Sequence, residues 1–271
     1  MFNTSYAMYL AVLGSMIHAL TVPGTIEAAQ RKRGFDKGMF EWLRKAPWGN
    51  PAFSGMFLSL VLFGFLGGIS GVVLGTEQIN LIMHNTMYVP GHFHATVVAG
   101  TTLAFMAITY LLIPLIFQRE VIWPRLARIQ PYLFALGITG ISLFMMGAGT
   151  LGVARRHWDI TFADAPLGFE YPASAFLMMG LNGLSAILAA LGGLAFIAVV
   201  VGSILFGRKI GDTAQAPAIR PQPSGSAVAQ YGSAGTLAIP GTAVLVGVFF
   251  VTFVLYYFVN WKYLAEVWPL R

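Results

Sequence analysis

The chemistry of this chain is concentrated in the segment MHNTMYVPGHFHATVVAG, at positions 83–100, which holds three of the five histidines. It opens a long apolar run, and an imidazole inside a membrane is costly to desolvate unless something binds it. His92 and His94 are two positions apart in a predicted helix that Pro90 and Gly91 begin, so their side chains leave the axis about 200° apart. One ion cannot bind both, but two separate haem irons can, since imidazole is a common axial ligand. The alternative is an interfacial cap in which both rings bond to carbonyls or water.

A pair of arginines is the second feature with chemical potential. Arg155 and Arg156 lie in the loop LGVARRHWDITFADAPLGFEY, at 151–171. The planar guanidinium fork suits carboxylates, and a haem carries two propionates, so the pair is a candidate propionate site. The alternative is that the arginines pair with Asp159 or Asp164 of the same loop.

Three further polar residues are weaker candidates. His84 precedes the histidine pair and is a candidate for bonding a propionate or holding a proton, although most loop histidines are simply solvated. Ser15 and His18 are three positions apart, hence on one helix face, where polar side chains can carry protons through water. Alternatively, Ser15 bonds to the carbonyl four residues earlier and His18 joins neighbouring helices.

Composition sets the class of protein that must position these residues. Of 271 residues, 57% are hydrophobic and 10% are charged, with a mean hydropathy of +0.73, whereas soluble domains carry about 25% charged residues. The chain is predicted to be an all-α polytopic membrane helical bundle. It contains no cysteine, which excludes disulfides and thiolate metal sites within it. The net charge of +6 is attributed to membrane topology, with lipid rather than nucleic acid as the partner.

About 20 apolar residues are needed to cross the hydrocarbon. Six runs qualify, and the first is interpreted as a span rather than a signal peptide because it has no basic leader and no cleavage site. They are Tyr6–Ala28, Phe53–Leu74, Val89–Ile116, Pro131–Val153, Ala173–Phe206 and Ile239–Val259.

The basic residues predict the orientation of these spans. Twelve of the sixteen Lys and Arg residues fall in the loops after the first, third and fifth spans, and these loops belong in the cytoplasm. The segment with His92 and His94 and the loop with Arg155 and Arg156 then both lie towards the outer face. We therefore expect an integral membrane protein whose candidate haem ligands lie towards the outer face.

Three regions are predicted. Residues 1–210 form a haem-binding bundle of five spans, 211–238 form a flexible cytoplasmic linker rich in Pro, Gly, Ala, Ser and Gln, and 239–271 form an additional transmembrane helix. The segment GMFEWLRKAPWGNPAF, at 38–53, mixes aromatic and basic residues and is expected to lie along the cytoplasmic headgroups.

These residues together resemble subunit I of the haem-copper oxygen reductases, most closely the B-type cytochrome c oxidases. The resemblance is carried by HNTMYVPGHFH at 84–94, WGNPAF at 48–53, ARR at 154–156 and a final extra span behind a linker. It covers essentially the whole chain, but only the C-terminal half of that subunit.

The resemblance implies a role for each candidate. His92 corresponds to the axial ligand of the high-spin haem and His94 to one ligand of the low-spin haem, with Phe93 on the short route between them. Arg155 and Arg156 match propionate-binding arginines. His84 matches a histidine near the high-spin haem propionate, and Ser15 matches a serine of the B-type proton pathway, in which His18 replaces the usual threonine.

Two departures from the family pattern bear on function. Asn80 replaces an aspartate near the propionates, and because an amide cannot exchange a proton as a carboxylate does, coupling to proton pumping is in question. Only two of the six ligand histidines are here, so the copper ligands and the partner of His94 are expected on a separate N-terminal half of the subunit, without which the chain is inactive.

The resulting hypothesis is a part of a terminal oxidase that reduces oxygen to water. Two haems and copper are the expected cofactors, a copper-bearing subunit II and cytochrome c or a similar donor are the expected partners, and proton uptake comes from the cytoplasm. The alternatives are a nitric oxide reductase of the same superfamily, a transporter or assembly protein without a cofactor, and a gene fragment.

Overall fold

The structure is a computed structural model that describes residues 2–156, 170–210 and 239–267. Within these ranges it is built of helices and contains no strand, so the predicted all-α membrane bundle is confirmed. The predicted linker at 211–238 lies outside the described residues. The elements are α1 (Phe2–Lys32), α2 (Glu41–Arg44), α3 (Pro51–Val61), η1 (Leu62–Gly68), α4 (Ile69–Gly75), α5 (Glu77–Met83), α6 (Tyr88–Phe93), η2 (His94–Thr102), α7 (Leu103–Ile116), α8 (Pro124–Thr150), α9 (Ala173–Phe206) and α11 (Pro240–Val267). The elements η1 and η2 are π-helical segments inside longer helices.

Four continuous helices are long and apolar enough to cross a membrane, at Pro51–Gly75, Tyr88–Ile116, Pro124–Thr150 and Ala173–Phe206. Their bounds lie within a few residues of the predicted spans, except that α8 begins at Pro124 rather than at Pro131. Trp123 has a left-handed backbone (φ 49°) that ends the preceding loop, and Pro124 then begins the helix. Pro131 is buried inside α8, where close packing against α3 outweighs its missing N–H group.

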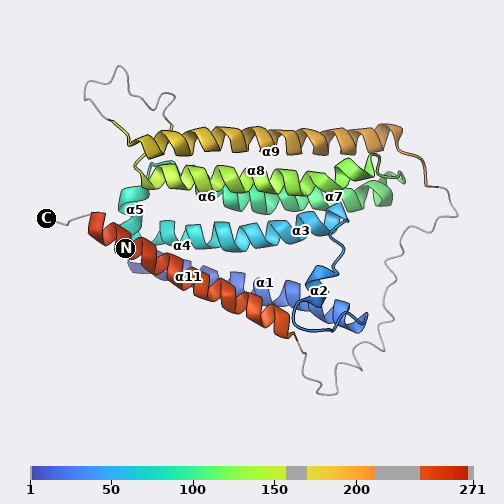
Figure 1. Ribbon diagram of the computed structural model, residues 1–271, viewed down its shortest axis with the longest axis horizontal. Helices are drawn as coiled ribbons and strands as arrows, with labels where there is room; N and C mark the ends of the chain where they lie inside the picture. The colour runs from blue at the N-terminus through green and yellow to red at the C-terminus, as the bar shows by residue number, and fades with distance from the viewer. Residues whose placement is uncertain (1, 157–169, 211–238, 268–271) are drawn as a thin grey trace.

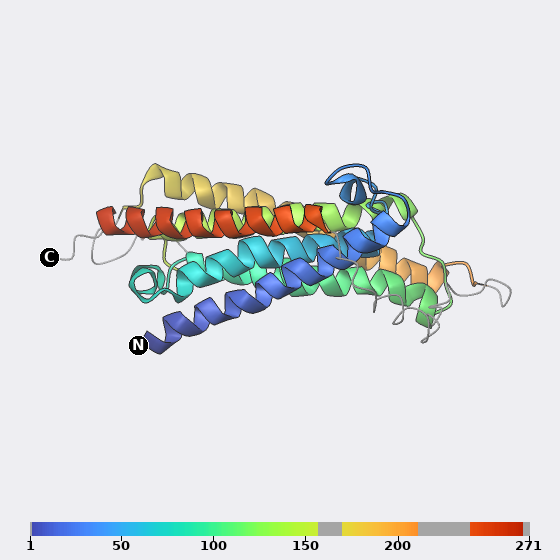
Figure 2. The same ribbon diagram turned by 90° about the horizontal axis from the view of Figure 1, so that it is seen from below.

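The long helices lie side by side along the longest axis of the molecule (Figures 1 and 2). In Figure 1, α9 and α8 form one side, α3 and α4 lie in the middle, and α1 and α11 form the opposite side. Helix α8 packs against α9 and α6, and α3 packs against α7. Helix α5 lies at one end of the bundle and α2 lies at the other, and we call these the histidine end and the α2 end.

Small residues allow the closest helix contacts. A Cβ atom at Gly137 of α8 would lie 2.8 Å from Cβ of Ala189 on α9, and one at Gly192 of α9 would lie 2.7 Å from the backbone nitrogen of Phe134. Glycine is therefore required at these crossings, as expected where helices associate in lipid through backbone approach rather than through large side chains.

The segment 38–53 contains one large and fully buried side chain. Trp42 of α2 is fully buried, and Trp48 packs edge-on against Phe53 and Phe57 at centroid distances of 5.4 and 5.1 Å. The first turn of helix α11, which is distant in sequence, lies against Trp42, since a Cβ atom at Gly241 would lie 2.5 Å from the indole nitrogen. The expected position of this segment along the cytoplasmic headgroups stays a prediction.

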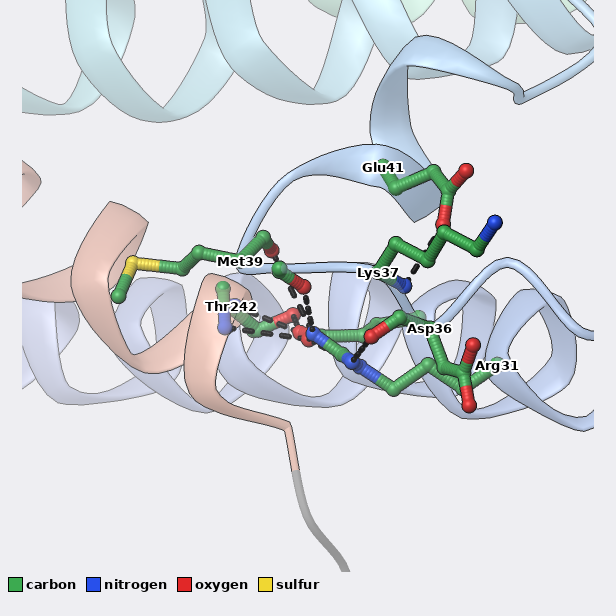
Figure 3. A network of polar contacts seen from close by, with 9 residues as sticks. Arg31, Asp36, Lys37, Met39, Glu41 and Thr242 are labelled. Carbon is green, nitrogen blue, oxygen red and sulfur yellow. Dashed lines mark hydrogen bonds and ion pairs between the residues drawn. The ribbon is translucent and has the colours of Figure 1, made fainter.

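Helix α11 is joined to α1 by a buried carboxylate. Glu27 is fully buried and accepts hydrogen bonds from the backbone N–H groups of Gly241 (3.1 Å) and Thr242 (2.7 Å) and from the Thr242 hydroxyl (2.7 Å). Arg31 donates to the same carboxylate at 2.8 Å and reaches the Gly38 carbonyl at 3.1 Å. Figure 3 shows Arg31 and Thr242 meeting below the 36–41 loop. The carboxylate thus satisfies the first N–H groups of α11, where the helix dipole favours a negative charge.

Candidate functional site

The histidine pair lies on a helix that is buried on one side and bare on the other. Along α6, η2 and α7, the buried positions include Gly91, Ala95 and Ala99. The opposite stripe is exposed and consists of residues at spacings of four: Phe93 (52% exposed), Val97 (53%), Thr101 and Phe105 (65%). His92 and His94 are both partly buried and flank the stripe at Phe93. The predicted divergence of the two imidazoles therefore agrees with this arrangement.

His92 is held by the neighbouring helix α4. Its Nδ1 lies 2.9 Å from the hydroxyl oxygen of Ser70, which is 2% exposed. A ring nitrogen engaged in this way fixes how the imidazole is turned and leaves Nε2 as the remaining ligand atom.

His94 is held by its own helix. Its Nδ1 lies 2.7 Å from the carbonyl oxygen of Pro90. A carbonyl can only accept, so Nδ1 carries the proton and the lone pair of neutral His94 is on Nε2. That tautomer is the one in which Nε2 can bind a metal.

The contact of α6 and η2 with η1 and α4 depends on glycine at every fourth position. A Cβ atom at Gly67 would lie 2.7 Å from the Thr96 side chain, and one at Gly71 would lie 2.9 Å from Cε1 of His92. On the other side of α6, a Cβ at Gly91 would lie 2.7 Å from Cγ of Met146 on α8. Helix α6 is therefore clamped between two neighbours, and this rigidity fixes where the histidines leave its surface.

The first arginine is held at the same end of the bundle. The segment before α6 pairs with the segment after α8 through an isolated bridge between Thr86 and Ala154 and a 2.8 Å hydrogen bond from Met87 N to the Val153 carbonyl. Arg155 is thereby placed beside Asn85.

Asn85 has a left-handed backbone (φ 65°) and anchors Arg155 twice. Its backbone carbonyl accepts from Arg155 N at 2.8 Å, and its side-chain oxygen accepts from the guanidinium at 2.9 Å. The Nε atom of Arg155 is buried and has no partner among the described residues. A held guanidinium with one free donor is suited to a carboxylate that the described part of the chain does not supply.

The remaining outer candidates are less enclosed. Arg156 is exposed and has a left-handed backbone (φ 71°), and His84 is exposed at the C-terminal end of α5. Asn80 is partly buried, and its amide nitrogen donates to the Leu74 carbonyl at 2.7 Å. In this conformation Asn80 ties α5 to the end of α4. Asp159 and Asp164, the alternative partners of the arginines, lie outside the described residues.

The predicted polar face of α1 is only partly described. Ser15 lies in α1, but its side chain is outside the described residues. His18 is exposed and borders a cavity of 360 Å³ between α1, η1 and α11, whose other lining residues include Phe65, Leu245 and Phe249. The surroundings of His18 are therefore apolar, and no chain of polar groups extends from it within the described lining.

Three residues of the site were not predicted from the sequence. Ser70, Gly71 and Asn85 contact or make room for the predicted residues, yet each is of a common type in membrane helices or loops. A weak signal existed for Gly71, because Gly67 and Gly71 have the four-residue spacing of close helix contacts. Nothing in the sequence indicated that Ser70 would face His92.

The residues present fit two axial haem ligands and one propionate contact. Both imidazoles have Nδ1 engaged and Nε2 available. Arg155 offers a buried donor, its Nε atom, that has no partner among the described residues at the same end of the bundle. The donor set is therefore suited to haem on chemical grounds.

Comparisons with known proteins agree with this chemistry. Residues 1–191 match the family described as Cytochrome C and Quinol oxidase polypeptide I. The chain is 33% identical over 220 residues to a cytochrome c oxidase subunit 1 from Thermus thermophilus, covering 80% of this chain but 37% of that protein. A second, shorter subunit 1 sequence from Thermus thermophilus is 34% identical over 117 residues, which are 43% of this chain and 98% of that sequence.

The fold has a solved counterpart. A heme-copper terminal oxidase dimer, determined by cryo-EM, is 26% identical with a TM-score of 0.69, and the match covers 94% of this chain and 43% of that one. The chain thus spans less than half of both the long subunit 1 relative and the solved oxidase chain.

Proposed function

Because this chain belongs to the Cytochrome C and Quinol oxidase polypeptide I family, we propose that it is the haem-binding part of subunit I of a membrane terminal oxidase that reduces oxygen to water. The chain is an integral membrane protein, with four described helices suited to span a bilayer. The particular resemblance of 84–94 to the B-type oxidases assigns it to that subclass within the proposal.

The proposed ligands are the two Nε2 atoms of the histidine pair. The resemblance of 84–94 to the family implies that His92 would hold the high-spin haem and His94 the low-spin haem. Their Nδ1 atoms are already engaged by Ser70 and Pro90, which leaves the two Nε2 atoms as the ligand atoms. When bound, these groups supply one-electron redox chemistry and an iron that binds oxygen. The protein orients the two rings on either side of Phe93, and the family's short electron route would pass this residue.

The proposed propionate contacts are at the same end. Arg155 is preorganised by Asn85, and no group in the described ranges pairs with its Nε donor. Arg156 and His84 are exposed beside the same loops. Asn80 has no exchangeable acid proton and is bonded to Leu74, so we propose that it stabilises this end of the bundle rather than loading a pumped proton. Proton uptake along Ser15 and His18 stays a proposal, and the apolar lining around His18 does not favour it.

The exposed stripe indicates what must complete the site. Phe93, Val97 and Phe105 are each more than half exposed, although they belong to the helix that carries both ligands. A haem bound there needs a second protein wall to exclude water and, for the low-spin haem, to supply another ligand. We propose that this wall is the part of a subunit I that lies outside the region matched here, and that it carries most of the copper ligands.

The wider assembly follows from the same proposal. A copper-bearing subunit II would pass electrons from cytochrome c or a similar donor to the histidine end, which would face the periplasm of a prokaryotic cell. The basic loops at the α2 end would face the cytoplasm. The linker at 211–238 would connect the haem-binding bundle to the additional helix at 239–271.

The engaged Nδ1 atom of both histidines is the observation that carries the proposal. The test is the visible spectrum of the complex purified from its native membrane, in which we expect one low-spin haem and one high-spin haem that binds carbon monoxide. His94→Ala should remove the low-spin signal and spare the other, and His92→Ala should do the reverse. His18→Ala is the matched control and should keep both. A wild-type complex without haem, or a His94→Ala variant that retains both signals, would contradict the proposal.

A further inference from the structure

We propose that Ser70 is a positioning residue that holds His92 in one orientation with Nδ1 as its hydrogen-bonded nitrogen, and that Gly71 leaves the space that the ring requires. The inference rests on the proposed function, in which His92 is an axial haem ligand. It assigns to α4 a role in haem chemistry, although α4 contributes no ligand of its own.

The geometry places one hydroxyl among three hydrogen-bonding groups. The Ser70 oxygen lies 2.9 Å from His92 Nδ1, 3.0 Å from the Gly67 carbonyl and within bonding distance of the Leu66 carbonyl. At 2% exposure, Ser70 has little access to bulk water, so its bonds are made within the protein.

The hydroxyl of Ser70 favours one tautomer of His92. A hydroxyl has one proton to donate and two lone pairs to accept with. Both carbonyls can only accept, so the hydroxyl donates to one of them and accepts from His92 Nδ1–H. The Gly67 carbonyl is also a hydrogen-bond acceptor for His92, so both groups favour a proton on Nδ1 and leave Nε2 as the nitrogen that can bind iron.

Gly71 supplies the second half of the arrangement. A Cβ atom there would lie 2.9 Å from Cε1 and 3.5 Å from Nε2 of His92. The methyl group of an alanine would displace the ring or the helix, because the shorter distance is less than van der Waals contact. The His92 ring thus lies against the backbone of Gly71, and Ser70 holds its Nδ1 atom.

The two histidines differ in where their restraint originates. His94 is held by Pro90, four residues earlier in the same helix, so its orientation is built in locally. His92 is held from another helix, so its orientation depends on how α4 packs against α6. A substitution at Ser70 should therefore affect one haem and leave the other unchanged.

The experiment compares Ser70→Ala with the wild-type complex by resonance Raman spectroscopy and haem content. A ligand imidazole that loses one of its acceptors on Nδ1–H becomes a weaker donor to iron, and in Ser70→Ala only the Gly67 carbonyl is left to accept from His92. We expect the iron–histidine stretching band of the high-spin haem to move to lower frequency and its haem affinity to fall about tenfold, with the low-spin spectrum unchanged. Ser70→Thr retains the hydroxyl and should restore the band.

Two further variants separate positioning from packing. Ser142→Ala removes another buried serine, on α8 beside α6, whose hydroxyl has no partner among the described residues, and it should leave the band unchanged. Gly71→Ala keeps the Ser70 hydroxyl but crowds the ring, and it should broaden or shift the same band.

The possible failures are distinguishable. A wild-type complex without a high-spin haem overturns the proposed function and this inference with it. An unchanged band in Ser70→Ala, beside normal wild-type signals, overturns the inference alone. Loss of both haems in Ser70→Ala would make Ser70 a general packing residue, and that result also overturns the inference.

Discussion

The two ends of the bundle hold polar groups in opposite ways. At the α2 end, the Glu27 carboxylate is fully buried, and its hydrogen-bonding partners are all protein groups of α1 and α11. At the histidine end, Arg155 is anchored by Asn85 but keeps a buried Nε donor without a partner among the described residues, and His92 and His94 flank an exposed stripe.

The difference separates a structural network from a binding site. A buried charge is tolerated when protein groups satisfy it, and such a network then joins helices. A charged group that is held in place but lacks a hydrogen-bond partner is a candidate for binding a ligand, because its desolvation is otherwise uncompensated. The buried indole Nε1 of Trp42, at the α2 end, also has no partner in the described part of the chain, so the contrast concerns the charged groups.

The largest effect on stability is expected from breaking the Glu27 network at the α2 end. Glu27→Ala leaves Arg31 and the first N–H groups of α11 without their acceptor, and removing one member of a buried ion pair costs about 3–5 kcal/mol. We expect this loss in the free energy of unfolding, measured by chemical denaturation in detergent, and readier proteolysis at α11. The haem spectra of the folded fraction should be unchanged.

Glu41 provides the matched control for that substitution. Glu41 accepts a single hydrogen bond, from Lys37 N at 2.7 Å, in a more exposed position of the same region. Glu41→Ala should cost less than about 1 kcal/mol. Equal costs for the two variants would contradict the view that the Glu27 network joins α11 to α1.

A smaller effect on stability is expected at the histidine end. Arg155→Leu in haem-free protein removes the hydrogen bond between the guanidinium and Asn85, worth about 1 kcal/mol. It also removes an unsatisfied donor, so the net change in the free energy of unfolding should be no larger. In the haem-loaded complex the same substitution should change the haem spectrum and midpoint potential, because a charge near the propionates is lost. Destabilisation comparable to that of Glu27→Ala would mean that both ends are structural.

The smallest effect concerns an exposed ion pair between the loops near the α2 end. Arg208 Nε donates to a Glu120 carboxylate oxygen at 3.0 Å, and this hydrogen bonding lowers the pKa of Glu120 below its ordinary value of 4.5. A lowered folded-state pKa means that the stabilisation is fully present above pH 4.5 and is lost as the pH falls through the lower value.

This pair can be tested by the melting temperature. The wild-type protein should lose slightly more thermal stability than Glu120→Gln when the pH falls from about 6 to about 3, and the difference should shrink at high salt because both side chains are solvent-accessible. A Glu120→Gln variant with the same pH dependence as the wild type would show that the ion pair contributes nothing.

Much of the fold followed from local patterns. Apolar run length predicted α9 at Ala173–Phe206 and the other long spans within a few residues, apart from the start of α8, because a bilayer requires a continuous apolar helix. The divergence of His92 and His94 followed from helical geometry, which depends on neither neighbour. The burial of Trp42 was not predicted, because the helix that packs against it begins some 200 residues later in the chain.

The sequence by itself determined the class of the protein, the positions of its helices and the two imidazoles that diverge around Phe93. Composition and periodicity decide these features residue by residue. Only the tertiary structure decided that Ser70 faces His92, that Asn85 holds Arg155 and that Glu27 receives the start of α11. Each of these contacts joins residues on different elements, so it depends on how the helices pack, and helix packing is set by the close approach of backbones at glycines rather than by any local pattern.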